Sequence, residues 1–178
     1  VAGSDSGGGA GIQADIKTVT ALGGFAMTAI TALTAQNTRG VEAIHEVPAE
    51  FVAEQIRVVV DDLGADCVKT GMLHRPDIID AVCDALDAHA PGVPIVVDPV
   101  MVAKGGASLL QDDAVATLRE RLVPRAAVLT PNAPEAEVLS GLIIGNRVEA
   151  EAAAHALGDL GPQAVVVKGG PLPGDTVV

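Results

Sequence analysis

The sequence predicts an α/β protein with a doubly wound, mostly parallel sheet, and three observations support this fold class. Short β-branched apolar runs alternate along the chain with longer segments of helical period. The apolar runs are continuous, which is typical of strands buried on both faces of a parallel sheet. Each run is followed by polar residues or by glycine and proline, as expected where a strand ends. Repetition of this kind favours right-handed crossovers.

The elements follow from this alternation. Five apolar runs are predicted to be strands: 30–33, 67–68, 95–97, 127–129 and 164–167. Six segments between them are predicted to be helices: 12–22, 48–63, 76–86, 115–122, 134–140 and 148–160. Proline opens three of these helices, and glycine directly follows several of their ends, which is the usual asymmetry of helix termini. In the first helix, the apolar residues Ile12, Ile16, Val19 and Leu22 are expected to form one buried face.

Length and composition limit the function classes. The 178 residues predict one domain, 1–178, and the 49% of apolar residues indicate a globular chain. The net charge of −12 and the absence of Trp and Tyr argue against a nucleic-acid partner, which requires basic groups or stacking platforms. No apolar run reaches the ~18 residues of a membrane span. The two cysteines do not form a disulfide framework, and a reducing compartment is expected.

Polar side chains directly follow the predicted strands. Gln36, Asp98, Asn132 and Lys168 each come after a different apolar run. Ligands of open α/β sheets bind outside the carboxyl ends of the strands, so these four side chains are predicted to face one crevice. The alternative is that they are ordinary turn residues at strand ends.

A glycine-rich segment, 3–11, leads into the first predicted helix and offers close backbone approach to a phosphate or a polar ring. A dinucleotide fingerprint is disfavoured, because the region from Met27 to Asn37 holds no acidic residue. A P-loop is disfavoured because Ile16 stands where the glycine before Lys17 is required. Asp15 is interpreted either as a first-turn carboxylate that the helix dipole favours or as a ligand acceptor.

Six motifs resemble the hydroxymethylpyrimidine and phosphomethylpyrimidine kinases of thiamine biosynthesis, within the ribokinase-like superfamily. They occur in the order and at the spacing of that family, over residues 2–18, 31–38, 68–73, 97–101, 129–136 and 167–170. The resemblance implies a three-layer α/β/α fold with a mostly parallel central sheet. It also implies an ATP- and Mg²⁺-dependent kinase that phosphorylates 4-amino-5-hydroxymethyl-2-methylpyrimidine and then its monophosphate.

The same resemblance implies residue roles. The residues that would line the pyrimidine pocket are Gly3, Ala10, Asp15, Gln36, Met72 and Val100. Asn132 and Lys168 would bind the nucleotide, and Asp98 and Glu135 would hold Mg²⁺. A Gln amide offers both donor and acceptor to an aminopyrimidine edge, and Met72 offers an adaptable apolar contact. Lys104, between small residues, is expected to be a solvated lysine, with closure over the phosphates as the alternative.

The family also carries a C-terminal Gly-rich segment with the anion hole and the catalytic residue, which this sequence does not match. We therefore expect a domain incomplete at both ends, with the catalytic residue beyond Val178. Two other functions are considered: a pyridoxal or pyridoxine kinase of the same superfamily, and a non-catalytic pyrimidine-binding module. A cytoplasmic location is expected from the two thiols, and the resemblance further implies a homodimer.

Overall fold

The computed structural model describes residues 1–102, 109–111 and 113–169, so Lys104 lies outside the described residues. The strands are β1 (Ala2–Asp5), β2 (Ile30–Gln36), β3 (Val41–Glu46), β4 (Val68–Thr70), β5 (Ile95–Val97), β6 (Ala126–Leu129) and β7 (Ala164–Val165). The helices are α1 (Gly11–Ala21), α2 (Ala49–Leu63), α3 (Pro76–His89), α4 (Ala114–Thr117), α5 (Ala133–Ser140) and α6 (Arg147–Gly158). A π-helical turn η1 (Leu118–Leu122) and a 3₁₀ turn η2 (Val123–Arg125) follow α4.

The strands form two adjoining sheets. One has the order β1-β2-β3 and the other the order β4-β5-β6-β7. All pairs are parallel except β2 with β3, which is an antiparallel hairpin. Val1 connects the sheets, since its nitrogen donates to the Lys69 carbonyl at 2.8 Å and its carbonyl accepts from the Gly71 N–H at 3.0 Å.

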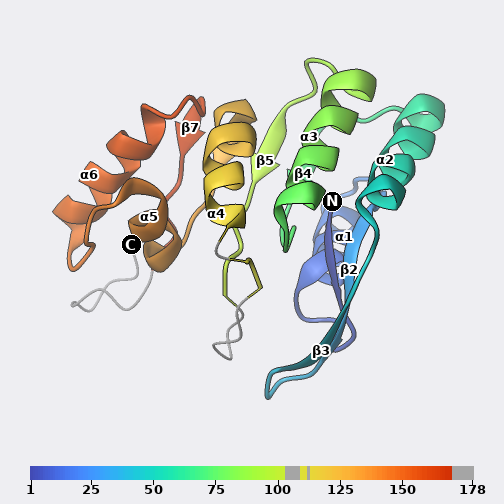
Figure 1. The fold of residues 1–178 in the computed structure, drawn as a ribbon, viewed down its shortest axis with the longest axis horizontal. Coiled ribbons are helices and arrows are strands. Elements are labelled where there is room, and N and C mark those ends of the chain that lie inside the picture. The colour runs from blue at the N-terminus through green and yellow to red at the C-terminus, as the bar shows by residue number, and fades with distance from the viewer. Residues whose placement is uncertain (103–108, 112, 170–178) are drawn as a thin grey trace.

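The direction of the strand order explains the layers. From β1 to β2 the chain moves one way along the sheet, and from β4 to β7 it moves the other way. Right-handed crossovers therefore place α1 and α3 on opposite faces. Figure 1 shows the helices α2 to α6 in a row in front of the strands, with α1 behind them. The predicted α/β class with a mostly parallel sheet is confirmed.

The main core lies between the parallel strands and the row of helices. Its largest fully buried side chains include Ile79, Leu86, Leu122, Leu129 and Leu157, which come from α3, η1, β6 and α6. A second, smaller cluster joins Ala32, Met72 and Leu109, with Val41, Ile44 and Val100 packed against it. The second cluster follows the carboxyl ends of β4 and β5 and is therefore close to the edge where ligands bind in such sheets.

The first helix differs from its sequence-based prediction in burial, although its position is as predicted. Of its apolar stripe only Ile12 is buried, whereas Ile16 and Val19 are 37% and 38% exposed. These side chains line a cavity of about 620 Å³ together with α2 and the segments that precede β2 and β4. Helical spacing thus predicted the face correctly, but among the described residues nothing packs closely enough on it to bury it.

The predicted helix 115–122 is also different in detail. It begins as α4 and widens into the π-helical turn η1 before the 3₁₀ turn η2. Pro124 has no N–H and cannot continue an α-helix, which accounts for the end of this segment. Arg121 and Arg125 then form ion pairs with Asp80, Asp84 and Asp87 of α3, which fix the turn against that helix.

The two thiols differ in environment and should differ in reactivity. Cys67 is exposed, whereas Cys83 is buried in α3, and burial raises the pKa of the Cys83 thiol to about 11. We expect Ellman's reagent at pH 8 to label one thiol in the native chain and two after denaturation, because the thiolate is the reactive form. A Cys67→Ser variant should show no label in the native state. Two native labels in the unmodified chain would contradict the buried position of Cys83.

Candidate active site

Four of the predicted site residues lie together at the carboxyl ends of β5, β6 and β7. The Lys168 Nζ is 2.6 Å from the Asp98 Oδ1, in an ion pair between residues that are distant in sequence. Lys168 and Asn132 also form an isolated parallel β-bridge, and the Lys168 N–H donates to the Pro131 carbonyl at 2.7 Å. The loops after three strands therefore bring one cation, one carboxylate and one amide to the same place.

Glu135 completes this group from the first turn of α5. It forms a capping box with Asn132: the Asn132 side chain accepts from the Glu135 N–H at 2.9 Å, and the Glu135 Oε2 accepts from the Asn132 N–H at 2.8 Å. Its other oxygen faces the Met101 N–H at 3.4 Å. Only 4% of Glu135 is exposed, which is rare for a carboxylate.

Burial sets the protonation behaviour of Glu135. Desolvation raises the pKa of this carboxyl above its ordinary value, and the nearby Asp98 acts in the same direction. The Asn132 N–H and the Lys168 ammonium act against this shift. A carboxyl that is buried next to a second carboxylate and a lysine is typical of a functional site.

The glycine-rich loop after β1 is organised by Asp5, which is 5% exposed. One carboxylate oxygen of Asp5 accepts from the Gly7 N–H at 2.7 Å, and the other accepts from the Gly9 and Ala10 N–H groups at 2.9 and 2.8 Å. The Gly8 N–H donates to the Asp5 carbonyl. The donors that a phosphate would need are therefore already used by Asp5. This arrangement favours a polar ring over a phosphate at this loop.

Gly11 begins α1 directly against β1. Its φ of +55° lies in the left-handed region, and a Cβ built on it would stand 2.4 Å from the Gly3 carbonyl oxygen. Both facts require glycine, because any other residue would be strained and would clash with backbone. The close contact fixes the start of α1, and with it Ala10, against the end of β1.

Gln36 ends β2 beside the same loop. Its backbone exchanges two hydrogen bonds with the Ser6 hydroxyl, at 2.9 Å from the Gln36 N–H and at 2.8 Å to its carbonyl. Its side-chain amide is 3.2 Å from the Thr34 hydroxyl, whose one proton is donated to the Ser4 carbonyl at 2.7 Å. The other end of the amide has no protein partner within the described ranges. The amide of Gln36 is thus held at one end and retains hydrogen-bonding capacity at the other.

Three of the residues predicted for the pocket, Gly3, Met72 and Val100, lie around one small apolar cluster. A Cβ on Gly3 would be 3.2 Å from the Met72 Cε, so Gly3 leaves room for the Met72 side chain. Met72 and Val100 belong to the small cluster with Ala32 and Leu109. The Val100–Met101 segment links this apolar cluster to Glu135, because Val100 packs on the cluster and the Met101 N–H faces the Glu135 carboxylate.

Asp15 lies elsewhere. Its carboxylate is 3.0 Å from the Lys69 Nζ, and both side chains line the cavity beside α1. The structure pairs Asp15 with Lys69 and shows no contact between Asp15 and Gln36. The predicted role of Asp15 in the pyrimidine pocket stays a prediction.

The donor chemistry at the nucleotide end fits Mg²⁺. In the described part of the chain no group of three or more His, Cys, Asp or Glu side chains is arranged to hold a metal ion. Mg²⁺ commonly binds through one or two carboxylates together with waters and substrate phosphates, so the pair Asp98 and Glu135 suffices. These two residues would hold the ion.

Sequence reasoning missed Asp5, although the residue was part of the first motif. A signal for it was present, since an Asp followed by glycines is typical of a side chain that binds backbone N–H groups one or two residues on. It also missed His74 and Glu46, which form a polar cluster described below.

None of the helices that the structure describes has the length and hydropathy to cross a bilayer.

The chain is similar to several known proteins. The family model described as phosphomethylpyrimidine kinase matches residues 5–178. The hydroxymethylpyrimidine/phosphomethylpyrimidine kinase of Bacillus subtilis is 53% identical over 175 residues, which cover 98% of this chain and 64% of that protein. The thiamine biosynthesis bifunctional protein ThiED of Geobacter sulfurreducens is 54% identical, over 99% of this chain and 36% of that protein.

Solved structures of kinases are also similar to this chain. The phosphomethylpyrimidine kinase of Clostridium difficile superimposes with a TM-score of 0.90 at 43% identity, covering 98% of this chain and 75% of that one. An ADP complex of the Bacillus subtilis pyridoxal kinase superimposes with a TM-score of 0.87 at 35% identity, covering 99% and 66%. The chain spans just under two thirds of the length of the Bacillus subtilis pyrimidine kinase that it matches.

Proposed function

Because the chain belongs to the phosphomethylpyrimidine kinase family, we propose that it acts in the ATP-dependent phosphorylation of 4-amino-5-hydroxymethyl-2-methylpyrimidine and of its monophosphate in thiamine biosynthesis. The observation that carries the proposal is the grouping of Asp98, Asn132, Glu135 and Lys168 at one edge of the sheet. Phosphoryl transfer depends mainly on positioning and on charge stabilisation, and this group supplies both.

Each end of the site has its own task in this proposal. Lys168 neutralises nucleotide phosphates, and Asn132 lies beside it at the start of α5. Asp98 and Glu135 would hold Mg²⁺, which would supply charge neutralisation at the phosphate oxygens. In the transfer, the substrate hydroxyl oxygen forms a new bond to the γ-phosphorus. The bond from that phosphorus to the leaving ADP oxygen breaks, and the hydroxyl proton is released to water.

The pyrimidine binds at the other end of the site. The Gln36 amide offers a donor and an acceptor to the ring edge, while Met72 and Val100 offer apolar contact to its faces. Gly3 and Ala10 complete the proposed pocket, whereas the role of Asp15 in it stays a prediction because its carboxylate pairs with Lys69. The end of the Gln36 amide that has no partner among the described residues supports this assignment.

We expect Gln36→Ala to weaken pyrimidine binding by roughly 1–3 kcal/mol, the cost of a buried polar edge without its partner. Isothermal titration calorimetry with the hydroxymethyl pyrimidine measures this change. Gln163→Ala is the matched control, because Gln163 is exposed and, among the described residues, only its backbone N–H bonds to the protein. An unchanged affinity in Gln36→Ala would remove this residue from the site.

Binding and activity measurements on the same purified chain also test two other functions. The likeness to pyridoxal kinases supports pyridoxal as a second candidate substrate. Tighter binding of pyridoxal than of the pyrimidine would favour that reading. A chain that binds the pyrimidine but releases no ADP in a coupled assay would favour a non-catalytic binding module.

A cytoplasmic location agrees with the two free thiols and with the biosynthetic role of the named relatives. The single domain over 1–178, the homodimer and the absence of a nucleic-acid partner stay predictions, and the net charge of −12 supports the last of these.

A further inference from the structure

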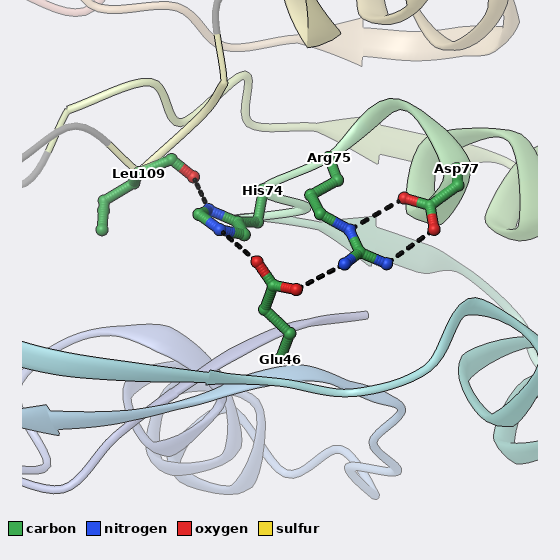
Figure 2. Close-up of polar contacts among 5 residues, drawn as sticks. All are labelled: Glu46, His74, Arg75, Asp77 and Leu109. Atoms are coloured by element: carbon green, nitrogen blue, oxygen red, sulfur yellow. Dashed lines mark hydrogen bonds and ion pairs between the residues drawn. The ribbon is translucent and has the colours of Figure 1, made fainter.

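A polar cluster ties the β2–β3 hairpin to the loop between β4 and α3 (Figure 2). Glu46, at the end of β3, binds both His74 and Arg75 of that loop. Arg75 also holds Asp77 in the first turn of α3, with its Nε 2.9 Å and its Nη2 2.6 Å from the carboxylate oxygens. Four charged or titratable side chains from three elements therefore meet beside the end of β3.

His74 is the centre of this cluster. Its Nε2 is 3.1 Å from the Glu46 Oε1, and its Nδ1 is 3.0 Å from the Leu109 carbonyl oxygen. A carbonyl oxygen only accepts, so Nδ1 carries a proton in the second contact. The His74 carbonyl also accepts from the Gln111 N–H at 2.9 Å. His74 thus holds the 109–111 segment through its side chain and through its backbone.

The backbone of His74 marks it as a constrained position. Its φ of +69° lies in the left-handed region, and within the described part of the chain no other residue except glycine adopts a positive φ. Its side chain is only 15% exposed. A non-glycine residue in this conformation costs free energy, and such residues gather at functional sites.

The segment that His74 holds forms part of the apolar cluster beside the proposed pyrimidine pocket. Leu109 is 7% exposed and packs with Ala32 and Met72. Its N–H donates to the Met101 carbonyl at 2.8 Å, so the segment is held from the opposite side as well. Val100, also proposed for the pocket, packs on the same cluster.

We propose that Leu109 forms an apolar wall of the pyrimidine subsite and that His74 is the residue that positions it. This inference rests on the proposed function, because the ligand is the substituted pyrimidine. Leu109 gives the ring a rigid apolar surface next to Met72. By binding the Leu109 carbonyl, His74 fixes how far the Leu109 side chain reaches into the pocket. Glu46 orients the His74 imidazole. His74 is a positioning residue and does not touch the substrate.

Two His74 variants separate positioning from simple stability. His74→Gly removes both side-chain hydrogen bonds and suits the positive φ, so it adds no backbone strain. His74→Asn also tolerates this conformation, and its amide nitrogen stands where Nδ1 stands in histidine, so it retains the donor to Leu109 and loses only Glu46. His89→Ala is the control, because His89 makes a comparable contact with Asp61, 2.8 Å long, between α2 and α3.

We expect calorimetry to show an about 3- to 10-fold weaker pyrimidine affinity in His74→Gly and recovery to within about twofold in His74→Asn. Leu109→Ala should weaken the same affinity about 10-fold through lost apolar contact. Affinity for ATP with Mg²⁺ should stay unchanged in all of these variants and in His89→Ala.

Three results would overturn the inference while the proposed function stands. They are unchanged pyrimidine affinity in both His74→Gly and Leu109→Ala, no recovery in His74→Asn, or an equal loss of ATP affinity. Leu109→Ala keeps the test decisive even where His74→Gly does not fold. A wild-type chain that binds ATP but no pyrimidine would instead overturn the proposed function itself.

Discussion

Asp5→Ala is expected to destabilise the fold by about 3–5 kcal/mol, because three backbone N–H groups lose their charged acceptor. Each such hydrogen bond is worth about 1.5–3 kcal/mol, and hydrogen bonds to water recover only part of this free energy. Asp5 is buried, and its carboxylate holds the Gly7, Gly9 and Ala10 N–H groups in the loop before α1. The melting temperature should fall by roughly 6–20 °C. Denaturant unfolding and calorimetry both measure the change.

Two further variants serve as comparisons for Asp5→Ala. Asp5→Asn retains one acceptor oxygen and should lose about half as much stability. Asn37→Ala is the matched control, since the Asn37 Oδ1 also accepts two backbone N–H groups, those of Arg39 and Gly40, but in an exposed turn. We expect it to lose less than about 1 kcal/mol. A loss in Asp5→Ala that is no greater than in Asn37→Ala would show that Asp5 does not organise the loop.

Glu135→Ala is expected to lower the free energy of unfolding by about 2–4 kcal/mol. It should also raise the Mg²⁺ concentration that kinase activity requires. The stability loss comes from the capping box, because the Asn132 N–H and the Met101 N–H lose their acceptors in a buried place. Glu135→Gln keeps an acceptor for Asn132 and should lose only about 1 kcal/mol while still raising the Mg²⁺ requirement.

Glu149 provides the matched control for the capping effect. It occupies the same third position of α6, whose N-cap Asn146 accepts from the Glu149 N–H at 3.1 Å, but its side chain is exposed. Glu149→Ala should cost less than about 1 kcal/mol and leave the Mg²⁺ titration unchanged. If Glu135→Gln showed the Mg²⁺ titration of the unmodified chain, Asp98 alone would remain as the proposed carboxylate for the ion.

The raised pKa of Glu135 also gives a sign for the dependence of stability on pH. In the folded state this carboxyl retains its proton to a higher pH than its ordinary value of 4.5, so between these two values the folded chain binds more protons than the unfolded chain. The contribution of Glu135 to stability therefore falls as pH rises through that window. Urea unfolding at several pH values should show this fall in the unmodified chain relative to Glu135→Gln. A difference that rises with pH would contradict it.

The sequence was a good guide to the elements that are buried on both faces. The runs that became β5 and β6 are continuous and apolar, and proline and glycine marked the ends of α3 and α5 within a few residues. The β3 strand was missed because Val41–Glu46 is an edge strand without a continuous apolar run and without a buried residue. The predicted strand 164–167 is shorter in the structure, where β7 ends at Val165.

The site was predictable in position but not in its contacts. Parallel strands place their following residues at one edge, and this rule brought Asp98 and Lys168 to the same place. The rule does not tell which side chains pair, so the ion pair between these two residues was not expected. Asp5 was missed for a related reason, because its role depends on a loop conformation that only the folded backbone reveals.

Glycines with similar backbone angles should differ widely in a saturation-mutagenesis experiment. Gly141 has a φ of +75° and a ψ of +10°, in the left-handed region, with no atom within 4 Å of an added Cβ, so Asn or Asp should be tolerated there at a cost of about 1 kcal/mol. Gly11 has a comparable φ but no space, because the Gly3 carbonyl stands 2.4 Å from the added atom. Position 11 should therefore accept no replacement, and a catalogue of tolerated variants would mark where α1 touches β1.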